Sequence, residues 1–100
     1  VGAVGQFDVF RLTGGQLVVD MQTDLIGLDA TRIVVPLRRA DSYAMLAELT
    51  PVVEFAGEGW IVRIPELYAV PQTALNLCEG SLRAQQDRLL GALSILVYGV

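Results

Sequence analysis

Short runs of apolar and β-branched residues, each followed by a turn signal, constrain the fold of this chain more than any other feature. Residues 6–12 alternate apolar and polar side chains, and residues 17–21 form a similar run just after Gly14 and Gly15. Glycine tolerates the positive φ that tight hairpin turns need. The pattern therefore predicts a β-hairpin over residues 6–21.

More strand signals follow this hairpin. A Gly-rich turn at residues 56–59 separates two of the runs and predicts a second hairpin, whereas residues 40–49 suit a short helix or turn. Pro36 cannot donate a ladder hydrogen bond, so it marks an edge, an end or a bulge. Short, closely spaced strands favour a small antiparallel barrel over a parallel sheet. The four additional strands are expected at residues 33–37, 51–55, 60–64 and 68–70.

The last segment has helical periodicity instead. Ser81 suits an N-cap, and Gly91 costs about 1 kcal/mol relative to Ala inside a helix, which predicts close packing at that position. Two interpretations of the apolar ending stay open, because Tyr98 and Val100 could pack back onto the barrel or form an exposed binding anchor. The apolar stripe of the expected helix comprises Leu82, Leu89, Leu90, Leu93, Leu96 and Val97.

Composition indicates a single domain that associates with a partner. Apolar residues make up 53% of the 100 residues and charged residues 18%, which is more apolar surface than a small monomer easily buries, so a homodimer is expected. The net charge of −4, with scattered basic residues, disfavours direct binding of nucleic acid. The longest apolar stretch, residues 89–97, is too short to cross a bilayer, and we expect a cytoplasmic protein.

Residues suited to catalysis are scarce. The chain has no histidine, and its single cysteine, Cys78, is expected to be a small buried hydrophobe in a reducing compartment. Asp20 and Asp24 form one carboxylate pair and Glu54 and Glu58 another, but no nucleophile accompanies them. We therefore expect no enzyme, no catalytic residues, no cofactor and no metal site. Asp24 is expected to bond nearby backbone amides, and Trp60, like Tyr43 and Tyr68, to lie in the core.

Several of these blocks, in their order and spacing, resemble the CcdB family of toxins from toxin–antitoxin modules. The similarity runs from Gln6 to the end, while residues 1–5 are interpreted as an expression remnant or a trimmed N-terminus. Residues 6–100 are thus expected to form one toxin domain. The blocks that carry the resemblance are residues 6–10, 17–26, 32–37, 51–53, Trp60, 70–71 and 98–100.

The resemblance implies both a fold and a function. Family members are SH3-like antiparallel β-barrels with a long C-terminal helix, and they form homodimers. They bind the A subunit of DNA gyrase and trap it on cleaved DNA, as poisons that serve plasmid maintenance. A CcdA-like antitoxin neutralises them. The gyrase-binding residues that the resemblance implies are Leu25, Ile26, Ser94, Val97, Tyr98, Gly99 and Val100.

The C-terminal positions depart from the usual family pattern. Better-known members end in Trp-Gly-Ile, where this chain has Tyr98-Gly99-Val100, and tyrosine is the weaker cation–π partner. Val97 replaces an aromatic residue and Ser94 an asparagine. Two alternatives therefore stay open: an endoribonuclease toxin of the MazF and Kid type, which shares this barrel, and a non-toxic relative that regulates by binding antitoxin.

Overall fold

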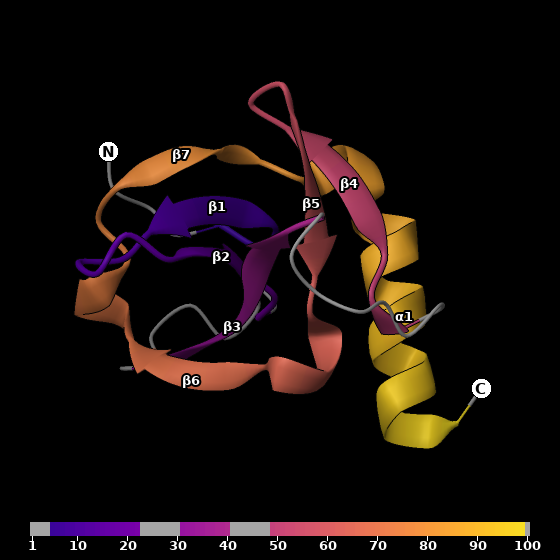
Figure 1. Cartoon of the computed structure of the whole chain (residues 1–100). Coiled ribbons are helices and arrows are strands. Elements are labelled where there is room, and N and C mark those ends of the chain that lie inside the picture. Colours follow the sequence, from indigo (N-terminus) through magenta and orange to yellow (C-terminus); the bar gives the residue numbers. More distant parts are fainter. Residues whose placement is uncertain (1–4, 23–30, 41–48, 100) are drawn as a thin grey trace.

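The computed structural model of the chain describes residues 5–22, 31–40 and 49–99. Seven strands form one curled antiparallel sheet in the order β4-β5-β3-β2-β1-β7, and β6 also pairs with β3 (Figure 1). The expected mainly-β fold, an antiparallel barrel with a C-terminal helix, is confirmed, and the curled sheet forms a half-barrel. The strands are β1 (Asp8–Arg11), β2 (Leu17–Asp20), β3 (Thr31–Arg39), β4 (Val52–Phe55), β5 (Glu58–Val62), β6 (Tyr68–Pro71) and β7 (Cys78–Ser81).

The first hairpin, β1–β2, has a core on each of its faces. Val9 pairs with Val19, and both side chains enter the larger hydrophobic cluster. Phe10 pairs with Val18, and this pair enters a second cluster on the opposite face, as the two-residue period of a strand requires. The predicted hairpin over residues 6–21 is confirmed, and its period-2 pattern places apolar residues on both sides of the sheet.

The central strand, β3, changes partners along its length. Its first half pairs with β6 up to Val34, and its second half pairs with β5 from Leu37 onward. Pro36 lies between these two ladders, where its missing N–H removes no bond to either strand. The change of partner at Pro36 lets one strand serve two parts of the curled sheet.

The second hairpin, β4–β5, is tighter than the sequence suggests. Ala56 and Gly57 both have positive φ, at 55° and 80°, which is the conformation that two-residue hairpin turns favour. Glu58 and Gly59, expected in the turn, already belong to β5. The expectation for residues 40–49 falls largely outside the described residues, as do Asp24 and Tyr43.

Strand β7 was not predicted, and it corrects two expectations. Cys78 pairs with Phe10 of β1 and is exposed, so the prediction of a buried cysteine is wrong. Ser81 ends this strand instead of capping the long helix, and its Oγ accepts a hydrogen bond from the backbone N–H of Arg83. A 3-10 turn, η5 (Arg83–Gln85), then leads into helix α1 (Gln86–Tyr98).

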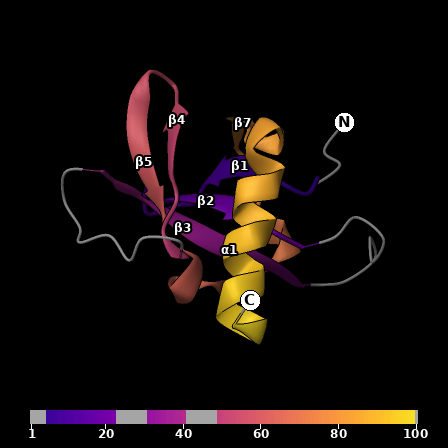
Figure 2. The ribbon, with the colours of Figure 1, turned by 90° about the vertical axis from the view of Figure 1, so that its right-hand side faces the viewer.

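Helix α1 packs along one side of the half-barrel (Figure 2). Leu89 and Ala92 are buried and join the larger cluster, with Leu93 packed against it. A Cβ on Gly91 would meet nothing within 4 Å, so the predicted close packing there is wrong. Within the described residues, no helix is long and apolar enough to span a membrane.

Candidate functional site

The outer side of α1 carries large apolar side chains that nothing in the described chain covers. Tyr98 is 77% exposed and Val97 60% exposed, and Leu90 is also exposed. Exposed apolar side chains grouped on one surface indicate an interaction site, whereas single ones do not. We call the set Leu90, Gly91, Ser94, Val97 and Tyr98 the outer face of α1.

Helical spacing brings these residues together. Positions three and four apart on a helix are neighbours, and the outer face follows this rule from Leu90 through Ser94 to Tyr98. The buried residues Leu89 and Ala92 lie on the other side. Leu90 was expected in the apolar stripe of the helix and not among the gyrase-binding residues, so this member of the outer face was missed. The available signal was that α1 is apolar on more than one side.

The helix ends cleanly at the candidate site. Gly99 has a φ of 79°, and its N–H donates to the carbonyl of Ile95 at 2.9 Å. A glycine in the left-handed (αL) backbone conformation commonly ends a helix, because its N–H bonds to a carbonyl of the last turn. Tyr98 is therefore the last helical residue and points into solvent, so of the two interpretations the structure favours exposure for this side chain. Val100 lies outside the described residues.

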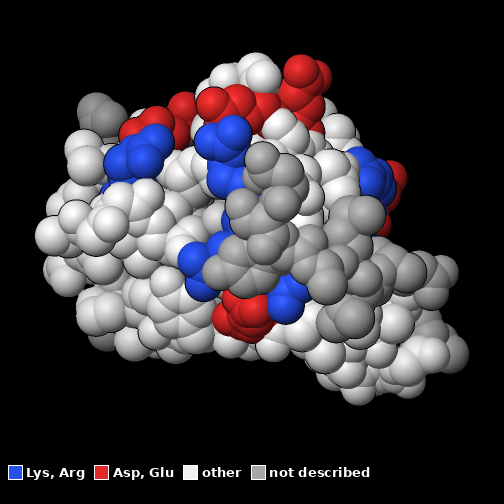
Figure 3. Space-filling view, in the orientation of Figure 1, with Lys and Arg blue, Asp and Glu red and all other residues white. Residues whose placement is uncertain are grey.

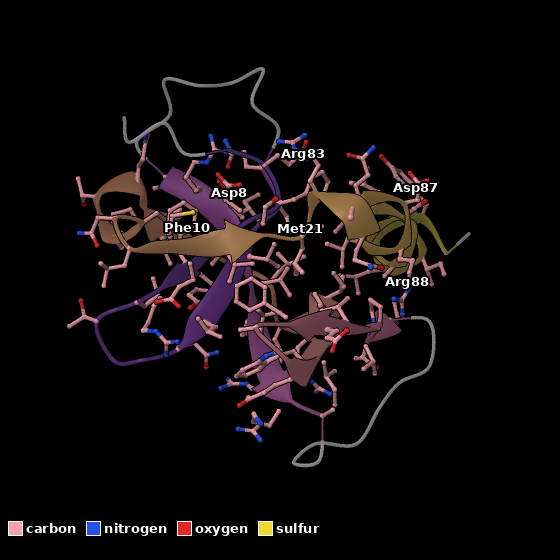
Figure 4. The ribbon with its side chains drawn as sticks, turned by 90° about the horizontal axis from the view of Figure 1, so that it is seen from above. Asp8, Phe10, Met21, Arg83, Asp87 and Arg88 are labelled. Atoms are coloured by element: carbon pink, nitrogen blue, oxygen red, sulfur yellow. The ribbon has the colours of Figure 1, made fainter. Side chains whose placement is uncertain are left out.

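Charge is absent from this end of the molecule. Residues 89–98 contain no charged side chain, and the surface over this end of the helix is uncharged in Figure 3. Charged side chains lie instead at the other end of α1, where Figure 4 shows Arg83, Asp87 and Arg88. A partner at the outer face would thus meet an apolar surface with one phenol group.

The two loop residues expected in the site, Leu25 and Ile26, lie outside the described residues, but the chain on either side of their segment is held firmly. The Gln22 side chain accepts a hydrogen bond from the N–H of Ile33 at 3.1 Å. Arg32 donates to the Gln22 carbonyl at 3.1 Å and to the Asp20 carboxylate at 2.8 and 3.0 Å.

Neither candidate carboxylate pair forms an acid–base site in the described residues. Asp20 is fully buried and bound to Arg32, and Asp24 is not described. Phe55 pairs with Glu58, so Glu54 points to the opposite face of the hairpin from Glu58. The described part of the chain also contains no group of three or more acidic, cysteine or histidine residues that could hold a metal ion.

Comparison with known proteins places the chain in a family. The family model described as CcdB protein matches residues 6–99. The chain belongs to the CcdB family. It is accordingly a toxin of a toxin–antitoxin module.

Solved structures resemble this CcdB chain in fold. An endoribonuclease from a mycobacterial species has a TM-score of 0.75 at 12% identity, covering 92% of this chain and 88% of that one. An endoribonuclease in complex with its cognate antitoxin, also mycobacterial, has a TM-score of 0.73 at 11% identity, with 90% of each chain covered. These similarities correct one expectation. The prediction that the chain is not an enzyme is contradicted, because proteins of this fold are named as enzymes.

Proposed function

We propose that this CcdB-family toxin binds the A subunit of DNA gyrase through the outer face of α1 and traps the enzyme on cleaved DNA. The observation that carries the proposal is the exposure of Tyr98 and Val97 on an uncharged helix end. The residues that the family resemblance implies for gyrase binding are Ser94, Val97, Tyr98 and Gly99 among those described, with Leu25, Ile26 and Val100 as further members of the set.

The chemistry of this surface suits a protein partner. A partly exposed tyrosine presents a ring face that attracts a guanidinium or ammonium group, and aromatic residues dominate the energetics of many interfaces. Gly91 and Gly99 add no side chain, so a partner's backbone can approach closely on both sides of Tyr98. The surface therefore combines an exposed aromatic side chain with two neighbouring positions at which no side chain blocks a partner's backbone.

The two-fold symmetry of a toxin dimer would allow two contacts with gyrase. A homodimer of residues 6–100 presents the outer face of α1 twice, related by a two-fold axis. Gyrase contains two A subunits, so a dimeric toxin engages both at once, and the second contact becomes intramolecular. The antitoxin neutralises the toxin by binding the same cytoplasmic dimer.

A gyrase assay with purified protein tests the proposal. We expect inhibition of supercoiling together with an increase in cleaved DNA. Removing Gly99 and Val100 should abolish both effects while the melting temperature changes little, because Gly99 lies outside the described core. Leu77→Ala is the matched control, since Leu77 is 57% exposed outside α1.

The outcomes separate this proposal from a regulatory role. Unchanged poisoning after the truncation would contradict a role for the end of the helix. No effect of the intact protein on gyrase at high concentration would support the alternative of an antitoxin-binding regulator.

RNA cleavage is a second candidate function. The observation that favours it is the structural similarity to two proteins named as endoribonucleases. Incubation of the purified protein with cellular RNA tests this candidate, and a mock purification from cells that lack the protein controls for a contaminating nuclease. Cleavage by the protein that the mock preparation lacks would establish the enzyme, whereas equal cleavage by both would indicate contamination.

A further inference from the structure

A pocket opens on the sheet, and none of its walls belongs to α1. Its volume is about 400 Å³, and it is lined by the end of β1, the β1–β2 turn, the end of β3 and the start of β5. This volume lies within the range of small-molecule sites. The pocket is thus separate from the outer face of α1.

Three arginines line this pocket. Arg11 comes from β1, and Arg38 and Arg39 come from the end of β3, so folding brings together basic residues that are far apart in the sequence. They are three of the seven basic residues of the chain, and the described residues of the lining include no acidic side chain. The expectation that the basic residues are scattered therefore holds for the sequence but not for this part of the folded surface.

Neighbouring groups hold the arginine side chains in place. The Gln16 amide donates to the carbonyls of Leu17 and Leu37 at 2.7 and 2.9 Å, and its oxygen accepts a hydrogen bond from Arg38. The Arg39 guanidinium lies 5.7 Å from the centroid of the Trp60 ring. The indole N–H of Trp60 donates to a backbone carbonyl at 3.1 Å, which fixes the ring. Trp60, expected in the core, is only partly buried and forms one wall of the pocket.

Carboxylates outside the pocket occupy these arginines only weakly. Arg11 pairs with Glu79 at 3.0 Å, Arg39 with Glu58 at 3.2 Å and Arg38 with Glu66 at 3.8 Å. Exposed pairs of this kind contribute about 0–1 kcal/mol each. The Glu79 carboxylate also raises the pKa of Arg11, but an arginine side chain keeps its charge at neutral pH with or without such a partner. A multivalent anion can therefore displace the carboxylates without removing any positive charge.

We propose that this pocket binds the phosphate of a nucleotide, with Arg11, Arg38 and Arg39 holding the phosphate oxygens and the base lying against the Arg39–Trp60 pair. Guanidinium groups match phosphate geometry, and planar aromatic side chains stack on bases. An open pocket of about 400 Å³ with an indole wall suits a phosphate joined to a planar base better than an extended acidic peptide. The inference goes beyond gyrase binding, and it holds whether or not the protein cleaves RNA.

The single tryptophan provides a direct test. Trp60 is the only tryptophan in the chain, so its fluorescence reports on the pocket alone. We expect uridine monophosphate to quench this emission saturably and inorganic phosphate to bind less tightly. A single-stranded oligouridylate tests whether the pocket binds a phosphate within an RNA chain. Its binding should weaken as salt is added, and the logarithm of the binding constant should fall against the logarithm of the salt concentration with a slope of about −0.7 for each phosphate contact.

Variants that each remove one positive charge test whether nucleotide binding is specific to the pocket. Calorimetry measures the nucleotide affinity of each variant independently of fluorescence. Arg11→Gln and Arg39→Gln should each weaken nucleotide binding about tenfold. Arg88→Gln removes the same charge from the exposed start of α1 and should change nothing. Gyrase inhibition should be unaffected in all three variants, so failure of this inference is distinguishable from failure of the proposed function.

Three results would overturn the inference. The first is no saturable binding of the nucleotide by the intact protein. The second is equal weakening by Arg88→Gln, which would indicate non-specific attraction. The third is tighter binding of a glutamate-rich peptide than of uridine monophosphate, which would assign the pocket to an acidic peptide.

Discussion

Two buried charges illustrate what the chain requires at the scale of single residues. Arg32 is 2% exposed and Asp20 is fully buried, and the pair connects β2 to β3 beside the segment that carries Leu25 and Ile26. Asp20 could be recognised in the sequence only as a possible acid or base, because its partner lies twelve residues away. Burial next to a guanidinium makes it a structural residue instead.

Replacing Arg32 alone should destabilise the protein strongly. Arg32→Leu leaves the Asp20 carboxylate buried without its partner, and we expect a loss of about 3–5 kcal/mol in the free energy of unfolding. Urea denaturation measures this value. The double variant Asp20→Asn/Arg32→Leu should recover part of the loss, and a cost below about 1 kcal/mol for Arg32→Leu would refute the role of this pair.

Helix α1 shows, at the scale of elements, where sequence patterns stop being informative. Its existence follows from the periodicity of Leu89 and Leu93, but its start does not, because Ser81 is recruited into β7 by pairing with Asp8 of β1. Long-range pairing also explains why β7, a short polar strand with Cys78 at its start, was missed. The αL cap at Gly99 agrees with glycine's frequent use just beyond a helix.

The same substitution should have opposite effects at the two glycines of this helical region. Gly91→Ala fills open space in mid-helix and should stabilise the protein by about 1 kcal/mol. Gly99→Ala forces a side chain into left-handed backbone and should destabilise it by about 1 kcal/mol. Thermal unfolding of both variants tests this difference in sign. Destabilisation by Gly91→Ala would show that the outer face of α1 is tightly packed in the protein's solution state.

The half-barrel as a whole depends on contacts between strands that are remote in the sequence. Alternating apolar residues predict six of the strands and the barrel class, whereas the order of strands depends on packing that no local pattern encodes. Gly80 of β7 meets Phe55 of the β4–β5 hairpin so closely that a Cβ would lie 2.8 Å from the ring. This contact joins the two edges of the curled sheet.

Adding a methyl group at this closure should therefore be costly. Gly80→Ala forces the Phe55 ring or β7 to move, and we expect a loss of about 1–3 kcal/mol in unfolding free energy. Gly57→Ala is the matched control, because Gly57 also has a positive φ, at 80°, but a Cβ there meets nothing within 4 Å. Equal stability of the two variants in urea would mean that the two edges of the sheet are not in contact.

The candidate site also belongs to the whole molecule, since a rigid barrel holds one side of α1 and leaves the other uncovered. Val97 and Tyr98, which the family resemblance implies for gyrase binding, are exposed, and so is Leu90, which the resemblance does not include. Departures from the family's usual C-terminal residues make the strength of the proposed gyrase contact the central quantity.

The affinity of the protein for the gyrase A subunit, measured by calorimetry for three forms, tests the central claim most directly. We expect Tyr98→Ala to weaken binding at least tenfold, because an aromatic residue at the centre of an interface commonly contributes about 2 kcal/mol or more. Leu77→Ala, which removes an exposed apolar side chain elsewhere, should bind like the unmodified protein. Equal affinities for the unmodified protein and Tyr98→Ala would contradict binding through the outer face of α1.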